Sequence, residues 1–328
     1  MTLTASQRDW LRVRSYLGEH RHALAVDAAG DVPGERRVAG TPLLAAPEWQ
    51  LAEPVPLHDL ELEFIPRIRP AEAGTALAES VAPLLPERPD GTRYRCYSDA
   101  LRDLAAPAVF ENRPTYRLAE ADLGQGRLAF TRGRYFDGVD TGEAAAHEYA
   151  AARLGGRDQH RPAGPAKVGH AGGMYQVIPV GIFQPSGAAS WHEREDFSLW
   201  RCMLREFDEE LRGTPEEYAA GPVDDGSWPF ARHMAAALDR GRVRVWCLGL
   251  GVDPLTYATD LLTVAVIDSR VFDELFSLDP RGNAEGRVLA AREFAAHVID
   301  RIVTSEPVQA AGAAVLRLAW RHREILTS

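Results

Sequence analysis

The first clear pattern of hydrophobic positions in the chain is helical. Side chains suited to burial recur at spacings of three and four residues, at Trp10, Val13, Leu17, His20 and Leu24. Thr4 and Ser6, whose hydroxyls can cap a helix N-terminus, stand just before this run. The pattern predicts one amphipathic helix over residues 7–28 that ends near Gly30.

The stretch after this helix loses the helical spacing because prolines recur. They stand at Pro33, Pro42, Pro47, Pro54, Pro56, Pro66 and Pro70. The second and third helices of a helix-turn-helix DNA-binding domain are therefore not expected here. Residues 55–65 alternate apolar and polar and predict an edge strand, or a segment lying across another domain. We expect residues 1–90 to form an N-terminal helix and a proline-rich arm that docks on the rest of the chain.

From residue 92 onward, strand-like and helix-like runs follow one another irregularly. Paired runs at 115–118 and 127–132, around the Gly-Gln-Gly of residues 124–126, predict a β-hairpin. The other predicted elements are a helix at 141–153, a loop at 157–173, a β-rich run at 174–183, helices at 199–211 and 229–239, strands at 242–250 and 261–267, and closing helices at 294–303 and 307–323. This mixture favours an α+β fold or an α/β sandwich over a doubly wound sheet, with residues 91–328 as one domain.

Composition narrows the class of partner and the compartment. The chain has 47 acidic and 37 basic side chains, a formal net charge of −10. This charge repels polyanions and argues against direct binding of nucleic acid. Three widely spaced cysteines fit neither a disulfide framework nor a cysteine zinc site, and predict a reducing, cytoplasmic location. No run of about 18 apolar residues occurs, so no membrane span is expected.

The most informative segment for chemistry is the predicted helix at 199–211. Its apolar side chains form one stripe at Trp200, Leu204, Phe207 and Leu211. Glu206, Glu209 and Glu210 lie three and four residues apart on another side, so their carboxylates share one patch of helix surface. Three neighbouring carboxylates suit a hard divalent cation with oxygen ligands. The pattern therefore predicts a Mg²⁺ or Mn²⁺ site, although an acidic helix face is more often simply solvated.

In the same helix, Arg205-Glu206-Phe207-Asp208-Glu209-Glu210 resembles the R-E-U-x-E-E core of the Nudix hydrolase signature, where U is a bulky apolar residue. Gly181 matches the glycine of its upstream lead. The resemblance implies a Nudix-like α/β/α sandwich, with the three glutamates as metal ligands and catalytic residues and Arg205 as their orienting partner. The signature's upstream glutamate falls on Phe197 by strict spacing, or on Gly187 if residues 188–196 are an insert. Its later glycine is displaced by Arg212 to Gly213.

The chain is also similar to a group of actinobacterial proteins often labelled Nudix-like or transcriptional regulators. The shared runs are R-G-R-Y-F-D-G-V-D-T-G-E-A-A-A-H-E-Y at residues 132–149, D-F-S-L-W-R at 196–201 and C-L-G-L-G-V-D-P-L-T at 247–256. Some of these relatives carry an added DNA-binding helix bundle, which this chain lacks.

Candidate substrate contacts lie in the first of these runs. Arg132 and Arg134 can grip a phosphate and Tyr135 can stack on a base, or the arginines can simply pin a turn through aspartates. His147 is a candidate acid or base, but a lone helical histidine is more often structural. The run Gly249-Leu250-Gly251-Val252-Asp253-Pro254 predicts a turn and does not match a dinucleotide-binding fingerprint.

Taken together, these features predict a Mg²⁺-dependent hydrolase of a nucleoside diphosphate-linked small molecule. The alternative is a non-catalytic Nudix-fold sensor that binds a nucleotide and reports through a partner, which the missing upstream glutamate favours. Either reading expects a nucleotide-type small-molecule ligand and allows a homodimer. A purely structural protein is the third reading.

Overall fold

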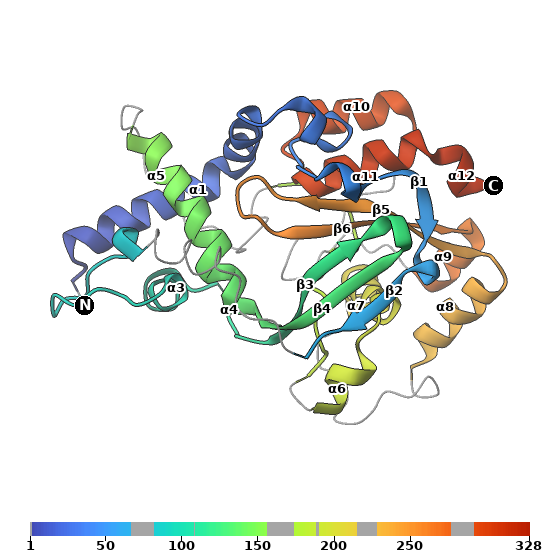
Figure 1. Cartoon of the computed structure of the whole chain (residues 1–328), viewed down its shortest axis with the longest axis horizontal. Coiled ribbons are helices and arrows are strands. Elements are labelled where there is room, and N and C mark those ends of the chain that lie inside the picture. The colour runs from blue at the N-terminus through green and yellow to red at the C-terminus, as the bar shows by residue number, and fades with distance from the viewer. Residues whose placement is uncertain are drawn as a thin grey trace.

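The structure is a computed structural model that describes residues 2–66, 82–107, 109–155, 174–187, 190–214, 228–276 and 292–328. Two three-stranded sheets lie at its centre, and helices surround them (Figure 1). This mixture of helices and small open sheets is compatible with the predicted α+β class. In the described ranges, no helix combines the length and the apolar character needed to span a membrane.

The predicted N-terminal helix is confirmed as α1 (Ala5–Gly30). The Thr4 hydroxyl accepts a hydrogen bond from the Gln7 N–H, and the Gln7 side chain accepts one from the Thr4 N–H, so the two residues form a capping box. α1 packs against α5 (Ala144–Gly155), and Figure 1 shows the two helices crossing at the left of the molecule. Their contact buries Leu17, Leu24, Ala146 and Ala150.

The proline-rich region contributes one strand to each sheet. β1 (Gln50–Pro56) pairs antiparallel with β5 (Val243–Val252), and β2 (Glu61–Phe64) pairs parallel with β4 (Arg127–Arg134). β2 is an edge strand, as its alternating pattern predicted. These pairings satisfy the backbone of the region by docking it on later parts of the chain. The boundary near residue 90 stays a prediction.

Both predicted hairpins form, the first at its predicted turn and the second with its turn later than the predicted residues 249–254, because residues 249–252 belong to a strand. β3 (Pro114–Asp122) returns as β4 through a turn in which Gly126 has φ 68°, a left-handed conformation that glycine adopts at little cost. β5 returns as β6 (Thr259–Ile267) through residues 253–258. The sheet orders are therefore β1-β5-β6 and β2-β4-β3.

The other helices frame these sheets. They are α3 (Tyr97–Ala105), α4 (Tyr135–Gly138), the π-helix Val139–Glu143, α6 (Ser190–Glu195), α7 (Leu199–Arg212), α8 (Pro229–Asp239), α9 (Ser269–Leu275), α10 (Ala296–Ser305), α11 (Ala310–Arg321) and α12 (Arg323–Thr327). The predicted helices at 199–211 and 229–239 are confirmed nearly to the residue.

One predicted element is wrong. The run at 174–183 forms no strand ladder with the described strands, and only Tyr175 makes an isolated bridge, with Val308. The polar backbone groups of its second half contact α7 instead, as the next subsection shows. The predicted loop at 157–173 lies outside the described residues.

The main core lies between the two sheets and is closed by α7 and α8. Along β5, Val243, Val245 and Cys247 face this core, whereas Trp246 and Leu248 face α11 on the other side of the sheet. Leu204 and Phe207 of α7 join the main core with Met234 of α8. The apolar stripe predicted for α7 is thus buried, and this burial sets which side of the helix remains for chemistry.

Two of the sequence runs noted above meet at the π-helix. Gly142, within the π-helix, lies so close to the backbone of Thr256 in the β5–β6 turn that a Cβ at position 142 would overlap the Thr256 carbonyl oxygen. Only glycine fits this approach, which joins the α4–α5 region to the β5–β6 turn.

Replacing Gly142 with alanine should lower the free energy of unfolding by about 1–3 kcal/mol, because the new methyl group meets a carbonyl oxygen in packed backbone. Gly138→Ala is the matched control, since nothing lies within 4 Å of a Cβ at that helical position. Urea denaturation followed by circular dichroism measures both variants. Equal effects at the two positions would show that the Thr256 contact does not constrain residue 142.

Candidate functional site

The candidate site is built where irregular chain lies along the exposed side of α7. α7 begins at the N-cap Ser198, whose hydroxyl accepts a hydrogen bond from the Arg201 N–H, and ends at Gly213 in the left-handed conformation. Gly213 caps the C-terminus of α7 in this conformation, which accounts for a glycine here, one place after the position of the glycine in the signature. The apolar stripe is buried in the core, so the acidic side of the helix faces residues 180–186.

Two of the three predicted metal ligands face this segment. The Glu206 carboxyl group lies directly against Gly181, in the space that any Cβ at position 181 would fill. One carboxylate oxygen of Glu210 accepts a hydrogen bond from the Val180 N–H, with 3.2 Å between N and O. The sequence therefore needs glycine at 181 to let Glu206 in. Glu209 is half-buried on the same helix.

Arg205 is the buried cation of the site, with 8% of its side chain exposed. One guanidinium nitrogen, Nη2, donates to the Gln184 carbonyl oxygen at 2.6 Å. The other, Nη1, lies 3.1 Å from Asp196 Oδ1. Arg205 does not point at the glutamates that follow it in the sequence. It joins the Gln184 carbonyl oxygen and Asp196, which stands two residues before the N-cap Ser198, to the helix.

The structure also shows what occupies the upstream position of the signature. Phe197 packs among Phe64, Tyr116, Phe130 and Phe183, with ring centroids 5.1–5.9 Å apart, so the residue at strict spacing belongs to the core. Gly187 faces the imidazole of His192. Of the acids in the insert, Glu193 pairs with Arg132 and Asp196 with Arg205.

Within the described residues, no three histidine, cysteine, aspartate or glutamate side chains are grouped closely enough to hold a metal ion on their own. Mg²⁺ commonly needs less than that, because it retains several waters and is bound by one or two carboxylates together with the phosphates of a substrate. Glu206 and Glu210, one helical turn apart and facing the same backbone, fit a cation that binds with a phosphate ligand. They do not make a closed protein cage.

The three predicted substrate contacts have different partners in the structure. Arg132 makes a two-pronged ion pair with Glu193 of α6. Arg134 lies at the end of β4, where its N–H donates to Asp137 and its guanidinium to the Asn112 carbonyl oxygen. Tyr135 packs against a cluster that contains Trp10, Tyr97 and Phe136. Burial raises the pKa of Tyr135.

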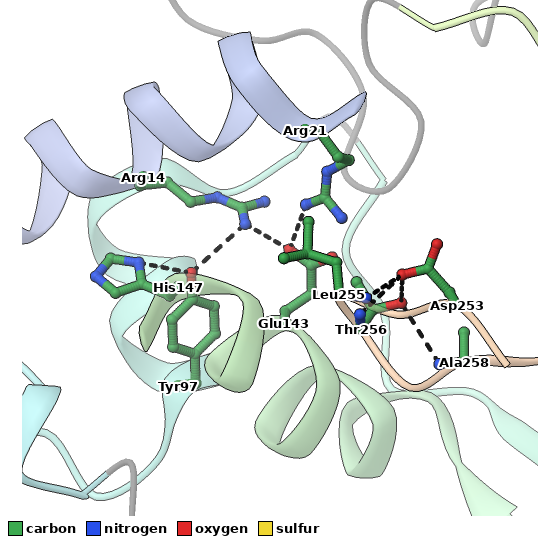
Figure 2. Close-up of polar contacts among 9 residues, drawn as sticks. All are labelled: Arg14, Arg21, Tyr97, Glu143, His147, Asp253, Leu255, Thr256 and Ala258. Atoms are coloured by element: carbon green, nitrogen blue, oxygen red, sulfur yellow. Dashed lines mark hydrogen bonds and ion pairs between the residues drawn. The ribbon is translucent and has the colours of Figure 1, made fainter. Parts of the chain in front are cut away.

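Sequence reasoning missed a second polar cluster, between α1, α3 and α5 (Figure 2). Arg14 and Arg21 of α1 both reach the same oxygen of Glu143, at 2.5 Å and 2.9 Å. Arg14 and Arg21 stand on the apolar face of α1, among Trp10, Leu17 and Leu24. Arginines on an apolar helix face are the sequence signal from which this cluster could have been predicted. A carboxylate partner for both is what that position requires.

His147 belongs to this second cluster and acts as a structural residue. Its ring stacks on Trp10, and its Nδ1 lies 3.2 Å from the Tyr97 hydroxyl. Only 3% of the residue is exposed. Burial, reinforced by the positive charge of Arg14, lowers the pKa of His147 to about 3, so the imidazole is neutral at physiological pH. Cys202 of α7 is similarly inert, since burial raises the pKa of its thiol to about 11.

In comparisons with known proteins, no family model matches the chain and no curated protein matches it. The Nudix assignment therefore rests on the residues of α7 and their surroundings, and stays a proposal.

The buried His147 should make stability depend on pH. Its pKa rises from about 3 in the folded chain to about 6.5 on unfolding, so unfolding takes up a proton between these values. The stabilising contribution is complete above pH 6.5 and is lost as the pH falls. From pH 7 to pH 5 the loss is ~2 kcal/mol.

The measurement is the difference in unfolding free energy between pH 7 and pH 5, from urea denaturation of wild type and His147→Gln. The variant keeps a neutral polar side chain and should show a pH difference smaller by about 2 kcal/mol. Because all other titrating groups are common to both proteins, an identical pH difference would mean that His147 titrates normally in the folded chain.

Proposed function

We propose that the chain is a Nudix-type hydrolase that acts, with Mg²⁺ or Mn²⁺, on a small molecule linked to a nucleoside diphosphate. The observation that supports this most is the arrangement around α7. Glu206 and Glu210 both face the backbone of residues 180–181, and the arginine that precedes them in the signature-like core is buried and bound to that same segment.

In this proposal Glu206, Glu209 and Glu210 hold the cation by their carboxylate oxygens. The cation, when bound, neutralises charge on the diphosphate and lowers the pKa of an attacking water. The chain's own contribution is positional. The close fit of Gly181 against Glu206 and the Val180 N–H bond to Glu210 fix two of the carboxylates before the ligand arrives.

Arg132 is the best supported of the proposed phosphate contacts. Its side chain is 66% exposed, and its partner Glu193 comes from α6. A phosphate group that offers the same two-pronged geometry can replace Glu193 as the partner of this arginine. Arg134 and Tyr135 remain proposed contacts to the phosphate and the base, and their packing at the end of β4 gives them less support.

A second candidate function is a non-catalytic sensor that binds a nucleotide and reports through a partner. The specific observation in its favour is that two acids near the missing upstream glutamate, Asp196 and Glu193, are already engaged. Asp196 is bound to Arg205 and Ser186, and Glu193 to Arg132. A sensor needs nucleotide binding at this face of α7, but it does not need the upstream glutamate that the signature has and this chain lacks.

The hydrolase proposal predicts Mg²⁺- or Mn²⁺-dependent release of nucleotide or phosphate from at least one member of a panel of nucleotide sugars, ADP-ribose and dinucleoside polyphosphates. Glu206→Gln and Glu210→Gln should each lower kcat/KM by about 100-fold, roughly 2.7 kcal/mol. Glu274→Gln, on the exposed side of α9, is the control and should leave turnover unchanged. A folded wild type without metal-dependent turnover of any panel member contradicts hydrolysis.

Thermal-shift titration separates the sensor from the hydrolase. A sensor should be stabilised by nucleotide without added metal, by about 2.7 kcal/mol when the ligand is present at 100 times its Kd, and should release no product. A hydrolase of the proposed type should need the metal for stabilisation by the same nucleotide. Absence of any shift with either addition would contradict both functions.

A further inference from the structure

The segment of residues 180–186 is attached to α7 in a regular register. Going up the segment, Val180 meets Glu210, Gly181 meets Glu206, Ile182 meets Cys202, and Gln184 meets Arg205. These contacts are made by helix side chains and segment backbone, so no strand ladder holds the two together. The register decides whether Glu206 and Glu210 face residues 180–181.

Asp196 closes the upper end of this register. The residue is 3% exposed and stands two places before Ser198, the N-cap of α7. Its Oδ2 accepts hydrogen bonds from the Ser186 N–H at 2.8 Å and the Ser186 hydroxyl at 2.6 Å. Its Oδ1 lies 3.1 Å from Arg205 Nη1 and 3.6 Å from Arg201 Nε. One buried carboxylate thus joins the end of the segment to two arginines of α7.

We propose that Asp196 is a positioning residue for the site on α7, which holds the segment in the register that Glu206 and Glu210 need to bind a cation. The inference rests on the proposed function, because it assigns Asp196 a role in that same site. Asp196 touches neither cation nor substrate. It acts through Ser186 and through Arg205, whose bond to the Gln184 carbonyl oxygen holds in place the backbone three residues after Gly181 and four after Val180.

The physical reason is that Arg205 cannot lose its charge and is almost wholly buried. Without the Asp196 carboxylate, the guanidinium keeps only neutral acceptors and gains free energy by turning toward water or toward the glutamates of its own helix. Either movement releases the Gln184 carbonyl oxygen. Residues 180–186 then shift relative to α7, and the carboxylates of Glu206 and Glu210 no longer face the same stretch of backbone.

Asp208 provides a matched control on the same helix. It is a buried carboxylate too, and it binds Arg212 at 2.6 Å, Trp228 Nε1 at 2.8 Å and the Thr214 hydroxyl at 2.7 Å. These partners tie the end of α7 to the start of α8 and do not involve residues 180–186. Loss of either carboxylate should destabilise the fold, but only loss of Asp196 should change the site.

The experiment compares Mn²⁺ binding by electron paramagnetic resonance in wild type, Asp196→Asn and Asp208→Asn, at a temperature where circular dichroism shows all three folded. Asp196→Asn should raise the Kd for Mn²⁺ by about tenfold or more, as loss of an outer partner of metal ligands does. Asp208→Asn should leave that Kd unchanged despite a comparable loss of thermal stability. Ser186→Ala removes one hydroxyl and should raise the Kd in the same direction by less, which keeps the test informative if Asp196→Asn does not fold.

Equal Mn²⁺ affinity in Asp196→Asn and Asp208→Asn, or in Ser186→Ala and wild type if Asp196→Asn is unfolded, overturns the positioning role while leaving the proposed function intact. A wild type that binds no Mn²⁺, with or without the nucleotides of the substrate panel, overturns the proposed function and this inference with it. The half-saturating Mg²⁺ concentration for hydrolysis should follow the Mn²⁺ Kd across the variants, whereas a purely structural role would lower the melting temperature and leave both unchanged.

Discussion

The guanidinium of Arg205 carries a permanent positive charge into the interior beside α7, and the local structure is arranged to satisfy it. Removing such a group from water costs several kcal/mol, which must be offset by a counter-charge and by acceptors for its remaining N–H groups. Asp196 supplies the charge and the Gln184 carbonyl oxygen accepts one of the hydrogen bonds. Asp196 precedes α7 and Gln184 belongs to the segment beside it. The bonds that satisfy the Arg205 guanidinium therefore also hold both of these parts of the chain against the acidic face of α7.

The same physical problem is solved a second time between α1 and the π-helix. Arg14 and Arg21 converge on Glu143, which the π-helix presents toward α1. The planar fork of arginine allows one side chain to engage acceptors from two elements at once, as Arg14 does with Glu143 and Tyr97. At both places, a buried ion pair between arginine and a carboxylate joins a helix to another part of the chain. One of them lies beside the candidate site, and the other docks the N-terminal helix.

Much of the fold follows from local patterns in the sequence. Helical periodicity located α1, α7 and α8, and the Gly-Gln-Gly turn located the β3–β4 hairpin, because short-range spacing and turn chemistry decide those elements. The β5–β6 turn lies later than predicted, since Gly249 and Gly251 pair within the ladder. The strand predicted at 174–183 does not form, because a β-rich run makes a strand only where a partner strand pairs along it. Here α7 side chains bind the backbone at Val180 and Ile182, and isolated backbone contacts to other elements occur at Tyr175 and Phe183. For the candidate site, helical spacing singled out the three glutamates, and the resemblance to the Nudix signature singled out Arg205. The partners of Arg132, Arg205 and Arg14 could not, since each lies on an element distant in sequence whose position depends on packing.

The pairing of β1 with β5 has a consequence for synthesis of the chain. Val55 lies opposite Cys247, so β1 leaves the ribosome roughly 190 residues before the strand that pairs with it. At about 5–20 residues per second, the nascent polypeptide spends on the order of 10–40 s with β1 unmatched. β2 waits for β4 in the same way over a shorter interval. The prolines within and beside β1 have no N–H group, so the unpaired strand lacks a continuous row of backbone donors during this interval. This protects the nascent chain from pairing with neighbouring nascent chains on a polysome.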